Sequence, residues 1–149
     1  MNKIYYPYQE FRQDLKILTA KIDVEFDTII ALARGGLSMG LMLGEYYDIR
    51  NVYSINTIGY EDTQKLDGVR VFNIPNLDKS KRVLIVDDIV DSGDTLIEVI
   101  KVLNQKYPKL EIITASLFYK KSAKIEPDYY VKQTDEWIEF FWSVDLGGL

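Results

Sequence analysis

The 149-residue sequence contains no cysteine and no histidine. Without cysteine there is no disulfide, no thiolate nucleophile and no zinc–thiolate site. Without histidine, the commonest general base and transition-metal ligand are also missing. Chemistry on this chain must therefore use carboxylates, lysine, tyrosine, backbone amides or a hard metal ion bound by oxygen.

Long apolar runs and blocks of like charge are absent as well. The run Thr28–Ala33 is far too short to span a bilayer, and the N-terminal MNKIYYPYQEF lacks the apolar core of a signal peptide. Lysine and arginine total 18 against 23 aspartate and glutamate, giving a net charge of -5. These features argue against nucleic-acid and membrane-surface partners, so we expect a cytoplasmic protein without an integral membrane segment.

The length of the chain corresponds to one domain with one sizeable core, so we expect residues 1–149 to form a single domain. Short apolar segments alternate with amphipathic ones, which predicts an α/β fold with a mostly parallel sheet flanked by helices on both faces. The predicted helices cover residues 8–22, 37–47 and 95–106. The predicted strands cover residues 28–33, 51–56, 69–74, 82–86, 110–119 and 128–132.

One stretch, RVLIVDDIVDSGDTLIEVI, concentrates polar residues between a predicted strand and a predicted helix. In an open parallel sheet, ligands bind beyond the carboxyl ends of the strands, where we expect Asp87, Asp88 and the loop Ile89–Thr95. Backbone N–H groups at the start of a helix can cradle a phosphate, and a glycine permits the tight turn. Carboxylates beside such a cradle are reasonable if they bind sugar hydroxyls or magnesium.

Two other interpretations fit parts of this stretch. An acidic pair after an apolar strand also occurs in receiver domains and nucleotide hydrolases, and serine, glycine and aspartate are ordinary helix-capping residues. A receiver normally carries its acidic pair after the first strand. A nucleotide hydrolase needs a glycine-rich loop ending in Lys-Ser or Lys-Thr, and this chain has none. The whole motif is therefore more specific than its parts.

The segment VLIVDDIVDSGDT resembles the phosphoribosyl-pyrophosphate motif of type I phosphoribosyltransferases. ALARGG, TASLFYKK and TDEWIEFFW resemble segments of the bacterial xanthine-guanine phosphoribosyltransferase group in the same order, so the likeness covers nearly the whole chain. It implies the type I phosphoribosyltransferase fold, with a flexible flap at about residues 57–70 and a small C-terminal hood at about residues 133–149.

The resemblance implies a purine-salvage enzyme that forms homodimers or homotetramers. Such an enzyme uses Mg²⁺ and transfers ribose 5-phosphate from phosphoribosyl pyrophosphate to a 6-oxopurine: guanine, xanthine or hypoxanthine. The products are the nucleoside monophosphate and pyrophosphate. A regulatory sensor of phosphoribosyl pyrophosphate, or a transferase for another base, remains an alternative. Joint retention of Asp91, Lys120 and Trp137 disfavours the sensor, because a sensor of the sugar phosphate needs no base pocket.

The resemblance also implies roles for individual residues of the sugar and phosphate sites. Asp87 and Asp88 would hold the ribose and its metal. Asp91 would exchange a proton at purine N7 as general acid or base. Other implied contacts fall into two groups: the 5-phosphate loop Asp91, Ser92, Gly93, Asp94 and Thr95, and the pyrophosphate loop Arg34, Gly35 and Gly36.

At the base site, Lys120 would read the 6-oxo group, although Lys121 and Lys124 lie close by in the sequence. Trp137 would stack on the purine, and Ile138 would supply backbone contacts near position two. These implied contacts are completed by Glu139, which would help to place the metal, and by Tyr60 in the flap. We interpret Phe141 and Trp142 as core or interface aromatics.

Two positions depart from the family pattern. Ser92 stands where threonine is commoner, and this exchange keeps the hydroxyl group. Asp94 stands where the resembled subgroup has glycine, and its carboxylate is compatible with a bound phosphate only if it points outward.

Overall fold

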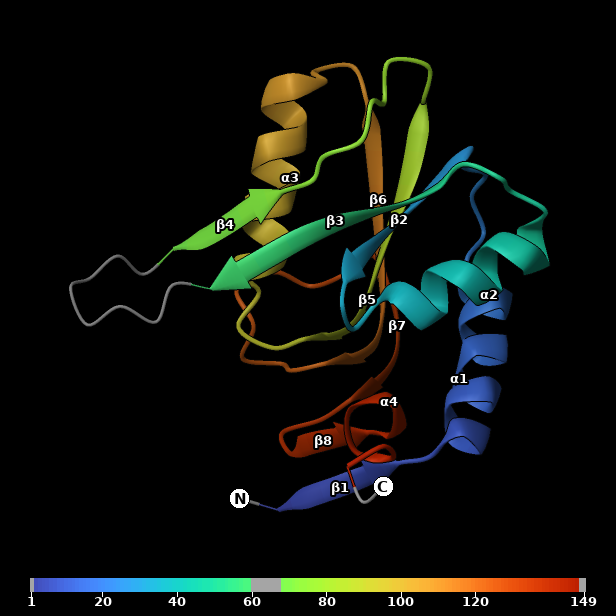
Figure 1. Ribbon diagram of the computed structural model, residues 1–149, viewed down its shortest axis with the longest axis vertical. Coiled ribbons are helices and arrows are strands. Elements are labelled where there is room, and N and C mark those ends of the chain that lie inside the picture. The colour runs from blue at the N-terminus through green and yellow to red at the C-terminus, as the bar shows by residue number, and fades with distance from the viewer. Residues whose placement is uncertain (1, 60–67, 148–149) are drawn as a thin grey trace.

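In the computed structural model, residues 2–59 and 68–147 are described (Figure 1). The elements in chain order are β1 Lys3–Tyr6, α1 Tyr8–Lys21, β2 Thr28–Ala33, α2 Leu37–Tyr47, β3 Val52–Gly59, β4 Val69–Phe72, β5 Arg82–Val90, α3 Asp94–Lys106, β6 Glu111–Tyr119, β7 Tyr129–Gln133, β8 Trp137–Phe140 and α4 Phe141–Val144.

A six-stranded sheet in the order β4-β3-β2-β5-β6-β7 forms the body of the molecule. All neighbouring strands run parallel except β3 and β4, which are antiparallel. Helix α3 covers one face of the sheet, and α1 and α2 cover the other (Figure 1). The predicted α/β fold, with its mostly parallel sheet and flanking helices, is therefore confirmed.

The core has one half on each face of the sheet, because successive side chains of a strand point to opposite faces. In β2, Ile29 and Ala31 belong to the cluster on the side of α1 and α2. Ile30 and Leu32 belong to the cluster that also contains apolar residues of α3. Burial on both sides explains why the strand is a continuous apolar run in the sequence.

A two-stranded parallel sheet of β1 and β8, together with α4, forms a separate layer that we call the hood. The first strand of the chain and its last strand and helix thus lie together in this layer, below the sheet in Figure 1. The register pairs Lys3 with Trp137 and Tyr6 with Phe140. β1 was not predicted, because its four residues have no clear alternation and its partner strand lies at the other end of the chain.

Buried polar contacts fasten the hood to the body. The Tyr6 hydroxyl donates to Asp14 Oδ2 at 2.6 Å, and Lys132 Nζ lies 3.1 Å from the same oxygen. Lys132 Nζ also donates to Glu10 Oε1 at 2.8 Å. Burial and the bond to Asp14 raise the pKa of Tyr6, so this hydroxyl remains a donor. The network joins β1, α1 and β7.

β5 is longer than predicted. It continues through the two aspartates to Val90, because its ladder with β6 still pairs Asp87 with Ser116 and Val90 with Tyr119. The expectation that the strand ends at residue 86, with both acids beyond its end, is therefore wrong. Asp87 and Asp88 lie on the strand itself.

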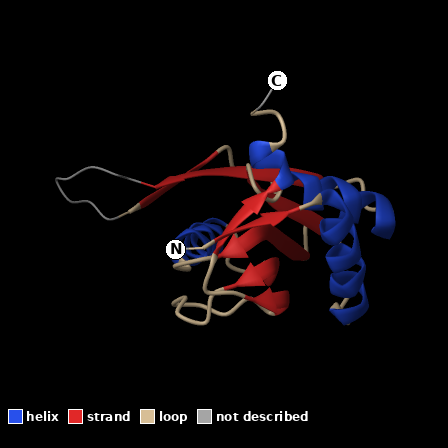
Figure 2. Cartoon of the chain, turned by 90° about the horizontal axis from the view of Figure 1, so that it is seen from below, coloured by secondary structure: helices blue, strands red, loops and turns tan. Residues whose placement is uncertain are grey.

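The predicted flap also changes at its ends. β3 runs through Gly59 and β4 begins at Val69, so both ends of the range 57–70 are strand. The paired ends of β3 and β4 project away from the body (Figure 2). Residues 60–67, including Tyr60, lie outside the described residues.

Within the described ranges, no helix is long and apolar enough to cross a membrane.

Candidate active site

The loop predicted to bind the 5-phosphate connects β5 to α3 through residues 91–93 and borders a small cavity of about 80 Å³. Asp87, Asp91, Ser92, Gly93 and Thr95 are among its lining residues. α3 begins at Asp94, one residue before the predicted start. The loop thus leads directly into a helix N-terminus, where backbone N–H groups without helical partners favour an anion.

Gly93 has a positive φ of 89°, which a residue with a side chain rarely adopts. A Cβ at this position would also lie 3.0 Å from Ile125 Cγ2 and 3.1 Å from the Ile125 nitrogen. Ser92 Oγ accepts a hydrogen bond from the Asp94 N–H at 3.2 Å. Glycine is therefore required at position 93 both for the turn and for the approach of the following loop.

The two strand aspartates form a partly buried acidic pair. Asp88 N–H donates to Asp87 Oδ1 at 2.9 Å, and Ile89 N–H donates to Asp88 Oδ1 at 2.7 Å. Burial raises the pKa of both carboxyl groups, and the charge of Asp88 raises that of Asp87 further. Sugar hydroxyls that donate hydrogen bonds to this pair, or a metal ion that the carboxylates coordinate, would stabilise its charged form.

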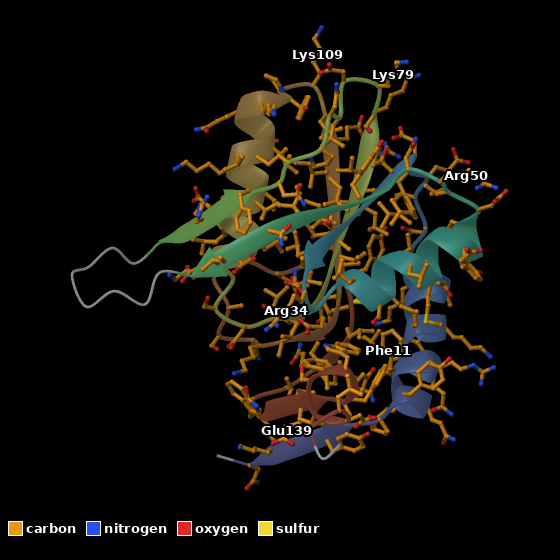
Figure 3. All side chains as sticks on the ribbon, viewed as in Figure 1. Phe11, Arg34, Arg50, Lys79, Lys109 and Glu139 are labelled. Carbon is orange, nitrogen blue, oxygen red and sulfur yellow. The ribbon has the colours of Figure 1, made fainter. Side chains whose placement is uncertain are left out.

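The loop after β2 forms the wall of a wide cavity of about 870 Å³, which Arg34, Gly35 and Asp88 help to line. The peptide bond between Ala33 and Arg34 is cis. A Cβ at Gly35 would lie 2.2 Å from Asp88 Oδ2, so only glycine leaves space for that carboxylate. Figure 3 shows Arg34 at the end of β2 that faces the hood.

A third cavity, of about 320 Å³, lies between the end of the sheet and the hood. Asp91, Lys120, Trp137, Ile138 and Glu139 are among its lining residues. Lys120 Nζ lies 3.0 Å from Asp91 Oδ1, and only 15% of the Lys120 side chain is exposed. The cavity thus combines a cation, a carboxylate and an aromatic side chain that is 53% exposed.

The three lysines near the end of β6 occupy different surroundings. Lys120 lines the cavity beside Trp137. Lys121 lines a separate cavity of about 450 Å³ near Tyr6. Lys124 Nζ donates to Asp94 Oδ1 at 2.7 Å, beside the 5-phosphate loop. Of these lysines, only Lys120 lines the cavity that Trp137 also lines.

The residues expected to bind metal are divided between two cavities. Asp88 lines the cavity of Arg34, whereas Glu139 lines that of Lys120 and lies 3.7 Å from Lys3 Nζ. Among residues 2–59 and 68–147, no group of three or more acidic side chains could hold a metal alone. Magnesium commonly uses one or two carboxylates together with substrate oxygens, and the acidic pair at Asp88 fits such a partial ligand set.

Residues to which the sequence analysis gave no binding role also reach these cavities. Trp142 and Ser143 of α4 line the wide cavity together with Arg34, and Ser143 lines the Lys120 cavity as well. The Trp142 ring stacks on Phe140 at 4.7 Å, so it also has the core role interpreted for it. No sequence signal relates α4 to the Arg34 loop, because only the folded hood brings them together.

Comparison with known proteins gives a consistent result. The family model described as "Phosphoribosyl transferase domain" matches residues 2–147. Xanthine-guanine phosphoribosyltransferase from Idiomarina loihiensis is 30% identical over 125 residues, which cover 82% of this chain and 74% of the relative.

Two solved structures share the fold over nearly their full lengths. Helicobacter pylori xanthine-guanine-hypoxanthine phosphoribosyltransferase has a TM-score of 0.91 and 39% identity, covering 99% of this chain and 97% of that one. The purine phosphoribosyltransferase from Pyrococcus horikoshii Ot3 has a TM-score of 0.79 and 32% identity, covering 95% and 94%. The resemblance read from the motifs is confirmed, and the chain belongs to the phosphoribosyltransferase family.

Proposed function

We propose that this phosphoribosyltransferase transfers ribose 5-phosphate from phosphoribosyl pyrophosphate to a 6-oxopurine base, as an enzyme of purine salvage in the cytoplasm. The observation that carries the proposal is the cavity in which Lys120 Nζ lies 3.0 Å from Asp91 Oδ1, bordered by Trp137 and Ile138. Relatives named for xanthine, guanine and hypoxanthine support the same substrate class.

The base site follows from the chemistry of its lining. An ammonium group donates hydrogen bonds and accepts none, so Lys120 favours the oxygen at position six of an oxopurine over the amino group of adenine. The exposed Trp137 offers an aromatic surface for stacking, worth about 1–3 kcal/mol per base. Backbone groups near Ile138 then act at position two, where guanine, xanthine and hypoxanthine differ.

The remaining groups serve the sugar phosphate. Backbone N–H groups of Ser92, Gly93 and Thr95 bind the 5-phosphate, with the Asp94 N–H beside them. Arg34 contacts the pyrophosphate, and Gly35 and Gly36 let the backbone approach it. The guanidinium suits this task because it pairs with phosphate oxygens in a bidentate way.

The reaction breaks the bond between ribose C1′ and pyrophosphate and forms a bond from C1′ to a purine nitrogen. Pyrophosphate leaves with the electron pair, and Asp91 exchanges the purine proton at N7 as general acid or base. Because the transition state resembles an oxocarbenium ion, no protein nucleophile is required. This agrees with a chain that lacks cysteine and histidine.

Magnesium, when bound, would supply positive charge to the leaving pyrophosphate and to the ribose hydroxyls. We propose that Asp87 and Asp88 hold those hydroxyls and the metal, with Glu139 assisting from the hood. The raised pKa of the acidic pair supports this role, because a group that is costly to ionise when alone gains most from a cationic partner.

We also propose that the protein forms a homodimer or homotetramer through the outer face of α2. This helix carries a single charged residue, Glu45, yet Leu41 and Tyr46 are 65% and 66% exposed. A helix that is apolar around most of its circumference is usually buried. Sedimentation equilibrium should give an oligomer for the native chain and a smaller species for Leu41→Glu; an unchanged mass for the variant would place the contact elsewhere.

The test of the function is product formation with phosphoribosyl pyrophosphate and MgCl₂, with guanine, xanthine, hypoxanthine, adenine and uracil offered separately. Turnover confined to the three 6-oxopurines is expected, because adenine presents an amino donor where they present an acceptor to Lys120, and uracil lacks the two-ring purine. Absence of turnover with every base, in folded protein that binds phosphoribosyl pyrophosphate, would favour a sensor. Turnover with adenine would contradict the role given to Lys120, and turnover with uracil would contradict a site built for purines.

A further inference from the structure

The connection between β6 and β7 includes residues 120–125, which pack against residues 91–93 of the proposed 5-phosphate loop. The Lys124 N–H donates to the Ser92 carbonyl at 2.9 Å. A Cβ at Gly93 would lie 3.2 Å from the Lys124 nitrogen, so the two backbones are in close approach. The main chain at Lys124 is therefore held against the loop by contacts that do not involve its side chain.

The side chain of Lys124 also contacts this loop, where it forms an ion pair with Asp94. Its Nζ lies 2.7 Å from Asp94 Oδ1, and this bond lowers the pKa of the Asp94 carboxyl. Side-chain exposure is 66% for Lys124 and 51% for Asp94. Exposed ion pairs of this kind add little to folding stability, so stability alone does not explain the pair.

The placement of Asp94 is informative because a carboxylate beside a phosphate site is unfavourable. Asp94 and Lys124 line an outer cavity of about 490 Å³, together with Ser92 and Thr95. The small inner cavity is lined by Gly93 and Thr95, and Asp94 is not among its lining residues. The carboxylate thus lies on the outer side of the loop, but Asp94 is the first residue of α3, so its charge acts on an anion at that helix start.

We propose that Lys124 is a positioning residue for 5-phosphate binding: it holds the Asp94 carboxylate on the outer side of the loop and offsets its charge. The N–H groups of the loop then remain attractive to the phosphate despite an acid at the helix start. This inference rests on the proposed function for the phosphate role of residues 91–95. It assigns a task to a lysine that would otherwise be an ordinary surface residue.

A simpler account makes a different prediction. Aspartate is favourable in the first turn of a helix because of the helix dipole, and its contact with Lys124 could be incidental. In that case, removing the lysine charge has no effect on phosphate binding. A direct contact of Lys124 with the phosphate makes a third prediction, since its loss then has the same cost whether or not Asp94 is charged.

The experiment is a double-mutant cycle with native protein, Lys124→Met, Asp94→Asn and the double variant. Isothermal titration calorimetry with MgCl₂ measures the affinity for phosphoribosyl pyrophosphate and, as a ligand without the 5-phosphate, for inorganic pyrophosphate. We expect Lys124→Met to weaken phosphoribosyl pyrophosphate by about tenfold in the native background and by less than about twofold in the Asp94→Asn background. Pyrophosphate affinity should change by less than about twofold.

Lys121→Met is the matched control, because it removes the same charge from a lysine that lines a different cavity. Lys124→Arg should retain binding, since it keeps the positive charge. Equal losses in the two Asp94 backgrounds, no loss at all, or an equal loss for pyrophosphate would each overturn the proposal. If Lys124→Met does not fold, as judged by thermal unfolding, the same cycle with Lys124→Gln decides.

Turnover by the native protein separates this inference from the proposed function. Phosphoribosyl pyrophosphate is the ligand of the family as a whole, so its binding does not depend on the identity of the base. If the double-mutant cycle gives the expected coupling but the native protein uses no 6-oxopurine, the role of Lys124 stands and the proposed function is refuted. If the native protein uses 6-oxopurines but the cycle shows no coupling, only the role of Lys124 is refuted.

Discussion

The residues proposed to bind the 5-phosphate and ribose, here called the phosphate end, and those proposed to bind the purine, the base end, come from differently spaced parts of the chain. The phosphate end comes from one continuous stretch, Asp87–Thr95, at the junction of β5 and α3. The base end combines Lys120 with the hood strand Trp137–Phe140, and that strand is in turn paired with Lys3–Tyr6. The phosphate end is local in sequence, whereas the base end forms only when β8 pairs with β1, near the opposite end of the chain.

This difference affects how each end tolerates change. The conformation of the loop at the phosphate end depends on its own turn and on residues 120–125, which pack against it. Only substitutions near the loop should therefore disturb phosphate binding. The base end depends on how the hood is held, and the hood is held by the network around Asp14. We therefore expect that a substitution far from the proposed purine site can weaken purine binding without changing the affinity for the phosphate group.

The largest effect is expected at Asp91, which borders the cavities of both ends. Asp91→Ala should lower kcat by about 10²–10⁴-fold, because it removes the general acid or base, with modest change in substrate binding. Single-turnover kinetics with a 6-oxopurine would measure this loss. An unchanged kcat would remove Asp91 from the chemical step.

A strong local effect is expected at Gly93, the turn of the phosphate end. Gly93→Ala forces a side chain into a backbone with φ of 89° and against Ile125. Strain of this kind costs about 1–3 kcal/mol, which urea unfolding would detect, and KM for phosphoribosyl pyrophosphate should rise by about tenfold or more. As a control, a Cβ at Gly59 meets nothing within 4 Å, so Gly59→Ala should not destabilise the fold. Equal stability of the two variants would contradict the strained turn.

Lys120 tests the base end directly. Lys120→Met should raise KM for a 6-oxopurine by about 10–100-fold, the cost of a charge-assisted hydrogen bond, and change KM for phosphoribosyl pyrophosphate by less than about twofold. Steady-state kinetics with each substrate varied in turn would separate the two constants. An equal rise in both would mean that the variant disturbs the loop as a whole. Lys121→Met provides the neighbouring control.

The smallest effect is expected from Asp14, which contacts the hood but lines none of the three cavities. Asp14→Asn weakens its contacts with Tyr6 and Lys132 and should raise KM for the purine by about three- to tenfold, at a stability cost of about 1–3 kcal/mol. Glu10→Gln alters only the more exposed contact of Lys132 and should have a smaller effect. A parallel rise in KM for phosphoribosyl pyrophosphate would show that the two ends are not independent.

The two ends were also unequally predictable. The residues of the phosphate end were identified from one motif because turn, helix start and acids are adjacent in the chain. Even there, the strand was predicted to end too early, since pairing with β6 carries it to Val90. At the base end the motifs selected Trp137 and Ile138, but the partner strand β1 was missed. Four residues without clear alternation form a strand only because a distant partner is available.

The sequence alone determined the α/β class and the order of the central elements, and it predicted which loop binds the 5-phosphate. These features depend on periodicity, turn residues and contiguous motifs, which act over a few residues. Only the tertiary structure showed that Lys120 contacts Asp91, that Trp142 lines the cavity of Arg34, and that Lys124 pairs with Asp94. Such contacts join residues far apart in the chain, and they arise from the packing of whole elements rather than from local preference.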